Sequence, residues 1–187
     1  MSLQQIYFDH LKSSGYFVIQ NYYSYNPDSC GVYLISDSEG SEYYAKFYRD
    51  KLTLFNNYYV TWQEQKEKIK IMENLGFCPK IKELIDIDQS RGILINHKFG
   101  VEYTNLMADS TRLAVTKAIG KLHSYGYIHG DLHCGNILVD SECNVKFVDF
   151  DDCFHESDER QRINYGNSYY AHDLETAKTR EYVFDCF

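Results

Sequence analysis

The sequence predicts an α+β protein of two lobes, with a strand-rich first half and a helix-rich second half. Residues 16–48 contain three short strand patterns separated by turn-forming residues, and residues 81–99 contain two more. Residues 59–75 and 111–124 instead repeat apolar side chains at helical spacing. A run of strands followed by helices is typical of the α+β class. With 187 residues, the chain is long enough for two small lobes that share a cleft.

The first half is expected to begin with a short amphipathic helix, whose apolar residues near one face are Leu3, Ile6, Tyr7 and Leu11. Strands follow at Tyr16–Tyr23, Val32–Ser36 and Glu42–Tyr48. Tyr59–Leu75 is the clearest helix pattern of this half, and Gly76 stands where a C-cap glycine belongs. The side of this helix with helical spacing is predicted to carry Val60, Glu64, Glu67, Ile71 and Leu75.

The next elements are a strand pair and a second helix. Ile81–Ile87 and Gly92–Phe99 are joined by the turn DQSRG. The helix is expected at Thr111–Ser124, capped by Asp109 or Ser110. Its apolar residues are Leu113, Val115, Ile119 and Leu122.

A short hairpin and a last helix complete the expected elements. The hairpin strands are Ile137–Val139 and Val145–Val148, and the helix is His172–Phe184. We expect residues 1–100 to form a first lobe of antiparallel strands and one helix. Residues 101–187 are expected to form a minimal helical second lobe.

Composition excludes several classes of partner. The net charge is −8 with no long basic run, which argues against nucleic acid. No apolar stretch approaches the roughly 20 residues of a membrane helix, and the N-terminus lacks a signal-peptide layout. The six cysteines form no CxxC pair. The expected location is therefore a reducing cytoplasm, or a host cytosol if the chain is a secreted effector.

The segment Tyr127–Asp152 carries the chemistry, in the order His129, Asp131, Asn136, Asp149. Phosphoryl transfer needs a carboxylate near the attacking hydroxyl and oxygen ligands for Mg²⁺ that bridges the nucleotide phosphates. A loop offering an Asp and an Asn, closed by a hairpin that delivers a second Asp, supplies both.

This segment resembles the protein-kinase-like superfamily. The kinase catalytic loop H-R-D-L-x-x-x-N followed by D-F-G stands here as H-G-D-L-H-C-G-N and D-F-D, similar to the atypical branch of the superfamily. The resemblance implies a two-lobed kinase-like fold with a truncated helical second lobe. It implies Asp131 as catalytic base, Asn136 and Asp149 as metal ligands and His129 as buried organiser of the loop. His133 takes the place of a phosphate-contacting lysine and is a further catalytic candidate.

The resemblance also implies nucleotide-binding residues in the first half. Lys46 lies on the third strand, where the family has its phosphate-contacting lysine, and Glu67 is preferred over Glu64 as its carboxylate partner. No G-x-G-x-x-G occurs, and Gly31 is what remains of a glycine-rich lid. After the strand ILINHKFG, Asn96 falls near the gatekeeper position, and His97 and Phe99 are expected to offer backbone contacts to adenine.

The shortness of the region after Asp149 resembles minimal kinases that some bacteria inject into host cells. Asp173 stands where kinases carry an aspartate that anchors the backbone of the catalytic loop. Its alternative role is that of a helix N-cap.

A zinc site formed by His123, His129 and His133 is a further alternative for this region, and the nearby glycines disfavour it.

The predicted function is that of a kinase using ATP and Mg²⁺, a minimal Ser/Thr protein kinase that acts on a protein substrate, with or without an activating partner. The first alternative is a small-molecule kinase of the aminoglycoside or choline type. The second is a non-catalytic pseudokinase that binds nucleotide or a partner.

Overall fold

The computed structural model describes residues 2–23, 31–52, 59–104, 106–158 and 173. The chain forms two compact units. The first contains Met1–Leu52, Tyr59–Glu67 and Pro79–Lys98, and the second contains Thr53–Tyr58, Lys68–Cys78 and Phe99–Phe187. Antiparallel strands and helices together confirm the predicted α+β class. No helix in the described part of the chain has the length and hydropathy needed to cross a bilayer.

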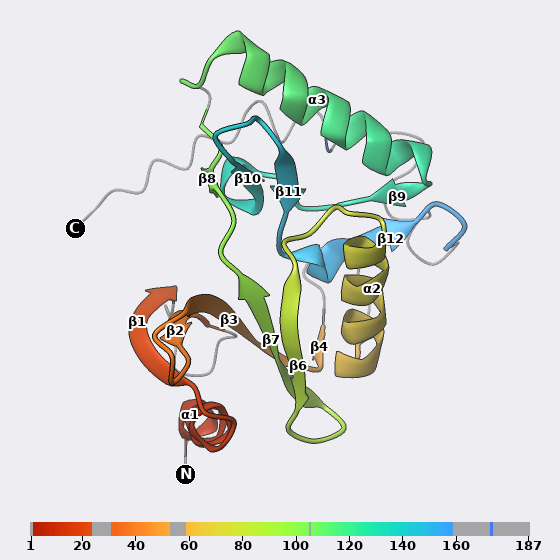
Figure 1. Ribbon diagram of the computed structural model, residues 1–187. Helices are drawn as coiled ribbons and strands as arrows, with labels where there is room; N and C mark the ends of the chain where they lie inside the picture. Colours follow the sequence, from red (N-terminus) through yellow and green to blue (C-terminus); the bar gives the residue numbers. More distant parts are fainter. Residues whose placement is uncertain (1, 24–30, 53–58, 105, 159–172, 174–187) are drawn as a thin grey trace, which may run out of the picture. The chain divides into compact units, whose positions relative to one another are not determined.

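The first unit is built on a five-stranded antiparallel sheet in the order β1-β2-β3-β7-β6 (Figure 1). Its strands are β1 (Phe17–Tyr23), β2 (Val32–Ser36), β3 (Glu42–Arg49), β6 (Ile81–Asp86) and β7 (Arg91–His97). All five agree with the predicted strands to within two residues at each end. Burial alternates residue by residue along β2 and most of β3, whereas residues 92–95 of β7 are all buried.

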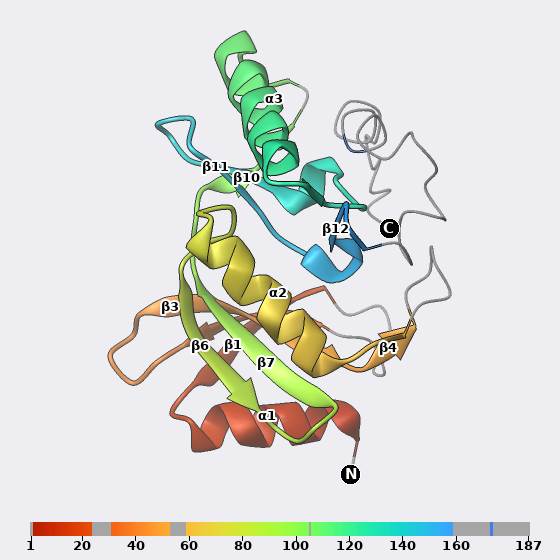
Figure 2. The ribbon, with the colours of Figure 1, turned by 90° about the vertical axis from the view of Figure 1, so that its right-hand side faces the viewer.

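Helix α1 (Leu3–Ser13) packs on one face of this sheet (Figure 2). The Tyr7 ring stacks on Phe47 with centroids 4.4 Å apart, and the Tyr7 hydroxyl donates to the Tyr48 carbonyl at 2.5 Å. Alternate strand residues point to this side, so the core contains Tyr7, Leu11, Tyr16, Tyr33, Ile35, Tyr43, Ala45, Phe47, Ile93 and Ile95. Four of the chain's 18 tyrosines are thus core residues of this unit.

Helix α2 (Trp62–Asn74) begins on the opposite face, after the short pair β4 (Lys51–Leu52) and β5 (Tyr59–Val60). The Trp62 ring lies over Gly92, where an added Cβ would come within 2.0 Å of it, and Trp62 Nε1 donates to Asp86 Oδ1 at 2.7 Å. This contact fixes the rotation of the helix about its own axis.

The predicted apolar side of α2 is wrong. The buried residues are Trp62, Gln65, Ile69 and Met72, whereas Glu67 is exposed and Ile71 is 39% exposed. The helix also starts three residues later than the pattern indicated, because Tyr59 and Val60 pair with β4. The space above Gly92 receives the indole ring of Trp62, and this contact decides which side of α2 is buried.

The second unit combines α3 (Asp109–Ser124) with short strands. β8 (Val101–Glu102), β10 (Ile137–Val139) and β11 (Val145–Phe147) form a sheet in the order β11-β10-β8, which confirms the predicted hairpin. β9 (Tyr127–Ile128) pairs with β12 (Phe154–His155). Two 3-10 helices, η1 (Cys134–Asn136) and η2 (Phe150–Asp152), flank the hairpin.

The predicted start of α3 needs correction. The N-cap is Ala108, with no side-chain cap, and Asp109 and Ser110 already lie in the first turn. Leu113 is 54% exposed, and Thr111 takes its place on the buried side with Val115, Ile119 and Leu122. The helix 172–184 lies outside the described residues, except for Asp173.

The core of the second unit joins α3, the hairpin and the C-terminal part of α2. Phe77 stacks on Phe147 with centroids 6.2 Å apart, and the Phe147 amide donates to the Phe77 carbonyl at 2.7 Å. The buried residues are Met72, Phe77, Cys78, Tyr103, Val115, Ile119, Leu122, Leu132, Ile137, Val139, Phe147, Phe150 and Cys153. This core includes Leu132, Ile137 and Phe150, the sequence neighbours of Asp131, Asn136 and Asp149.

Candidate functional site

The hairpin brings Asn136 and Asp149 to the same end of the second unit. Ile137 pairs with Phe147 in the ladder, and the Val148 amide donates to the Asn136 carbonyl at 3.0 Å. Asp149 follows directly, with φ 63° and ψ 60°. This left-handed conformation costs a non-glycine residue about 1–2 kcal/mol, so the surrounding contacts must hold it.

The loop between β9 and β10 is closed by its own polar side chains. Asn136 Nδ2 donates to the Asp131 carbonyl at 2.8 Å, and Asn136 is buried. The Gly135 amide donates to His133 Nδ1 at 3.1 Å, which leaves the proton of a neutral ring on Nε2. That nitrogen lies 3.8 Å from Asp131 Oδ2. The loop therefore presents Asp131 and His133 side by side.

Asp173 contacts the start of this loop from far along the chain. Its Oδ2 accepts from the His129 amide at 2.8 Å and its Oδ1 from the Gly130 amide at 2.9 Å. His123 Nε2 lies 3.0 Å from Oδ2. Burial alone would raise the pKa of Asp173, but the hydrogen bond with His123 and those from the two backbone amides outweigh it and lower that pKa. The fully buried carboxylate is thus held ionised by its partners.

The backbone conformation and surroundings of residue 130 explain why a glycine stands between His129 and Asp131. Its φ is +82°, and an added Cβ would lie 2.6 Å from the Asp152 carbonyl oxygen. The loop therefore passes directly against the segment after Asp149, and no larger residue fits without a shift of backbone.

His129 links the two segments from inside the core. Its ring is fully buried between Phe147 and Phe150, and Nε2 lies 3.0 Å from the Val148 carbonyl. Burial lowers the pKa of this imidazole, despite the nearby carboxylates that raise it. A neutral ring that donates from Nε2 fits that bond. His129 thus holds the carbonyl immediately before Asp149.

The donor set fits Mg²⁺. Asn136 uses its amide nitrogen on the Asp131 carbonyl, so its Oδ1 is the atom left to ligate a cation. With an Asp149 carboxylate oxygen it forms a pair of hard ligands of the kind Mg²⁺ takes together with phosphate oxygens. The described residues contain no group of three or more His, Cys, Asp or Glu arranged for a metal. The three histidines of the zinc alternative each make a different contact, so that alternative has no support.

The nucleotide-binding candidates of the first unit lie on the sheet. Lys46 on β3 pairs with Val32 and Leu94, on the face opposite α1, and its Nζ lies 4.6 Å from the Tyr48 ring centroid. The Gly31 carbonyl accepts from the Phe47 amide at 3.0 Å, so Gly31 and Lys46 are close neighbours.

The predicted adenine-contacting residues fall in both units. His97 ends β7, and its ring lies 5.3 Å from that of Tyr43. The neighbouring Asn96 has a buried Oδ1 without a hydrogen-bond partner among the described residues. Phe99 belongs to the second unit, where Lys146 Nζ lies 6.0 Å from its ring centroid.

Of the two glutamates considered for Lys46, Glu64 has a local task. Its Oε2 accepts from the Thr61 amide at 2.9 Å and the Thr61 hydroxyl at 3.0 Å, while the Glu64 amide donates back to that hydroxyl. This is a capping box at the start of α2. Glu67 is exposed and accepts from Gln63 at 2.8 Å, and its pairing with Lys46 stays a prediction.

Two contacts near the site were not anticipated. His123 was considered only as a zinc ligand, yet it meets Asp173. Lys68 was not among the predicted site residues, yet its Nζ donates to the Phe150 and Asp151 carbonyls, each at 3.0 Å. The sequence holds no local signal for the second contact, because lysine on a helix is usually solvated.

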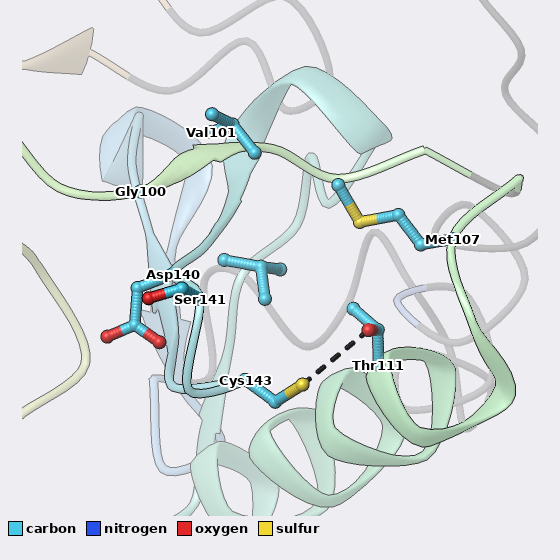
Figure 3. Close-up of a pocket in the computed structure, with 8 residues that line it drawn as sticks. Gly100, Val101, Met107, Thr111, Asp140, Ser141 and Cys143 are labelled. Carbon is cyan, nitrogen blue, oxygen red and sulfur yellow. Dashed lines mark hydrogen bonds between the residues drawn. The ribbon is translucent and has the colours of Figure 1, made fainter.

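A surface cavity of about 620 Å³ lies elsewhere in the second unit (Figure 3). The Thr111 hydroxyl and the Cys143 sulfur, two of its lining groups, lie 3.6 Å apart (Figure 3). Its lining comprises Gly100, Val101, Met107, Thr111, Val139, Asp140, Ser141 and Cys143. None of the predicted site residues is among them, so this cavity is separate from the loop of Asp131.

Comparison with known proteins agrees with the geometry of the second unit. Residues 96–175 match the lipopolysaccharide kinase (Kdo/WaaP) family. The chain is 28% identical to sperm motility kinase Z of Mus musculus over 101 residues, 48% of this chain and 20% of that protein. It is 39% identical to a 2-5A-dependent ribonuclease of Mus musculus over 56 residues, 30% of this chain and 8% of that protein. The chain therefore spans a small part of both relatives.

These matches confirm the resemblance to the protein-kinase-like superfamily that the sequence predicted. The matched family is one of kinases, in agreement with the predicted enzyme class of a phosphotransferase with a hydroxyl acceptor. The matched stretch includes all the site residues predicted in the second unit, from Phe99 to Asp173, as well as His97.

Proposed function

We propose that this chain is an ATP-dependent phosphotransferase that transfers the γ-phosphoryl group of Mg-ATP to an alcohol hydroxyl. The observation that carries the proposal is the joint support of Asp131, Asn136 and Asp149 in the second unit. The first two are tied by the Asn136–Asp131 hydrogen bond, and the hairpin brings Asp149 to Asn136. Asp173 holds the loop from behind.

The residues have distinct roles in this proposal. Asp131 accepts the proton of the acceptor hydroxyl while the new O–P bond forms and the bond to the leaving ADP breaks. His133, whose Nε2 lies 3.8 Å from Asp131 Oδ2, is proposed to help position that carboxylate. Asn136 and Asp149 would hold Mg²⁺, which neutralises charge on the phosphates.

Most of the residues proposed to bind the nucleotide lie in the first unit, and Phe99 belongs to the second. Lys46 is proposed to contact the phosphates, with Glu67 as its partner, and Gly31 to cover them. His97 and Phe99 are proposed to contact the adenine. The pairing of Val32 with Lys46 supports this proposal. Because Val32 directly follows Gly31, the pairing places Lys46 close to Gly31.

The acceptor we propose first is a serine or threonine hydroxyl of a protein. The part of the chain similar to sperm motility kinase Z supports this choice. The second candidate is a saccharide hydroxyl, because residues 96–175 match a family described as lipopolysaccharide kinases. A cytoplasmic site of action and an activating protein partner belong to the first of these proposals.

The test is incubation of the purified chain with γ-labelled ATP and Mg²⁺, offering lysate proteins, lipopolysaccharide and aminoglycosides as separate acceptors. Asp131→Asn should reduce transfer about 10²–10⁴-fold. Asp149→Asn should abolish the Mg²⁺ dependence of nucleotide binding, whereas the exposed Asp109→Asn should match the unmodified chain. Label on protein supports the first acceptor, and label on saccharide supports the second. Nucleotide binding without transfer would indicate a pseudokinase, and absence of both would overturn the proposal.

A further inference from the structure

Asp149 is held by contacts on both sides in the chain. The carbonyl before it, that of Val148, lies 3.0 Å from His129 Nε2. The two carbonyls after it, those of Phe150 and Asp151, each accept from Lys68 Nζ at 3.0 Å. A residue in the left-handed conformation is thus flanked by three carbonyls that are bound by side chains from elsewhere.

The Lys68 contact is tertiary and specific. Lys68 lies in the part of α2 that belongs to the second unit, 82 and 83 residues before its two acceptors. One turn further along α2, Met72 is buried in the same core as Phe150. An ammonium group that donates twice to backbone carbonyls forms charge-assisted hydrogen bonds, which are stronger than neutral ones.

We propose that Lys68 is a positioning residue that holds η2. It thereby fixes Asp149 in its left-handed conformation, in position to bind a metal ion. Its role as a positioner of η2 stands on the contacts alone, and its effect on metal binding rests on the proposed function of Asp149. Lys68 touches no reacting atom and acts through Phe150 and Asp151.

Two buried cysteines provide a readout that needs no catalytic activity. Cys153, 1% exposed, follows η2 directly, and Cys78, 5% exposed, lies in the core of the same unit. Burial raises the pKa of each thiol to about 12, so both resist thiol reagents in the folded chain. Release of η2 should expose Cys153 alone, whereas general loosening of the unit should expose both.

The experiment compares Lys68→Met with Lys68→Arg, which keeps the charge, and with Lys70→Met, a control at an exposed position two residues along α2. Each variant is treated with a thiol reagent, and labelling of each cysteine is followed by mass spectrometry. Lys68→Met should speed Cys153 labelling about tenfold and leave Cys78 unchanged. Lys68→Arg should restore protection, and Lys70→Met should behave as the unmodified chain.

The same variants are then titrated with Mg²⁺ at fixed ADP. Lys68→Met should raise the Mg²⁺ concentration for half-maximal nucleotide binding about tenfold, with binding in EDTA unchanged. Equal labelling of Cys153 in the unmodified and Lys68→Met chains, or parallel acceleration at Cys78, would overturn the positioning role. If the unmodified chain binds no nucleotide, the proposed function is overturned. The labelling of Cys153 and Cys78 would still decide the role of Lys68.

Discussion

The two units bury different kinds of side chain. The first has a core of stacked aromatic and aliphatic residues on a sheet, and Gln65 is its one fully buried polar residue among those described. The second also has an apolar core, but it buries His129, Asn136, Asp151 and Asp173 against it. Polar groups are costly to bury unless they are bonded. The first unit thus depends mainly on shape, whereas the second also depends on hydrogen bonds to its buried polar groups.

Phe47→Ala should be the most destabilising change and should test the shape-dependent unit. Phe47 is 2% exposed and stacks on Tyr7 and Tyr33, so its loss should cost about 3–5 kcal/mol of unfolding free energy. Urea unfolding followed by the fluorescence of Trp62, the single tryptophan, measures it. Phe17→Ala, at a 54% exposed position, is the control and should stay within about 0.5 kcal/mol. Equal effects at the two positions would contradict the role of the aromatic core.

Gly130→Ala against Gly40→Ala separates backbone strain from close approach. Both glycines have φ near +82°, but an added Cβ meets nothing within 4 Å at Gly40 and the Asp152 carbonyl at 2.6 Å at Gly130. We expect about 1 kcal/mol of destabilisation at Gly40 and about 2–4 kcal/mol at Gly130. Urea unfolding gives both values. A difference below about 0.5 kcal/mol would mean that the loop does not pass against Asp152.

Asp173→Asn tests the polar network with little change of shape. An amide cannot accept from both backbone amides and also meet His123, so about 2–3 kcal/mol of unfolding free energy should be lost at pH 7. The folded chain lowers the pKa of Asp173, so its stabilisation is present above the unfolded pKa, about 3.9, and lost as pH falls through the folded value. The difference between the two chains should therefore be constant from pH 7 to 5 and shrink below pH 4.

Unfolding in urea at several pH values, with the exposed Asp109→Asn as control, gives that profile. Trp62 fluorescence reports the first unit and Cys153 labelling the second. A loss seen equally by both probes would show that the two units unfold together, which would weaken the contrast between them.

The smallest predicted effect is a pH dependence from His129. Burial lowers the pKa of its imidazole, so below about pH 6.5 the unfolded chain binds a proton that the folded chain does not. Stability should then fall with decreasing pH by about 1.4 kcal/mol per unit from this group alone. In His129→Gln, whose amide still donates toward Val148, this part of the slope should disappear. Identical slopes for the two chains between pH 7 and 5 would refute it.

Much of the first unit could be predicted because its signals are local. Strand positions in the first unit follow from short apolar and aromatic runs bounded by turn residues, and the hairpin at 137–147 of the second unit follows equally from apolar runs around a polar turn. The orientation of α2 could not, since it depends on the space above Gly92 that receives Trp62. The sequence also could not reveal that α3 lacks a side-chain cap. Asp109 and Ser110 are good N-caps by residue type, but Ala108 occupies the N-cap position.

The site divides in the same way. The order of His129, Asp131, Asn136 and Asp149 within 21 residues is legible in the sequence, because the reaction requires those residue types on one loop and one hairpin. The partners that hold them are distant: Asp173 lies 44 residues beyond His129, and Lys68 lies 82 residues before Phe150. No periodicity or turn signal encodes such contacts.

By itself, then, the sequence determined the α+β class, the strand positions and the identity of the polar residues around Asp131. Only the tertiary structure decided which face of α2 is buried, which charged groups lie inside, and that Lys68 and His129 flank Asp149. The physical reason is that backbone preferences and hydrophobic periodicity act over a few residues. The pairing of a buried charge depends on which chain segments the core brings together.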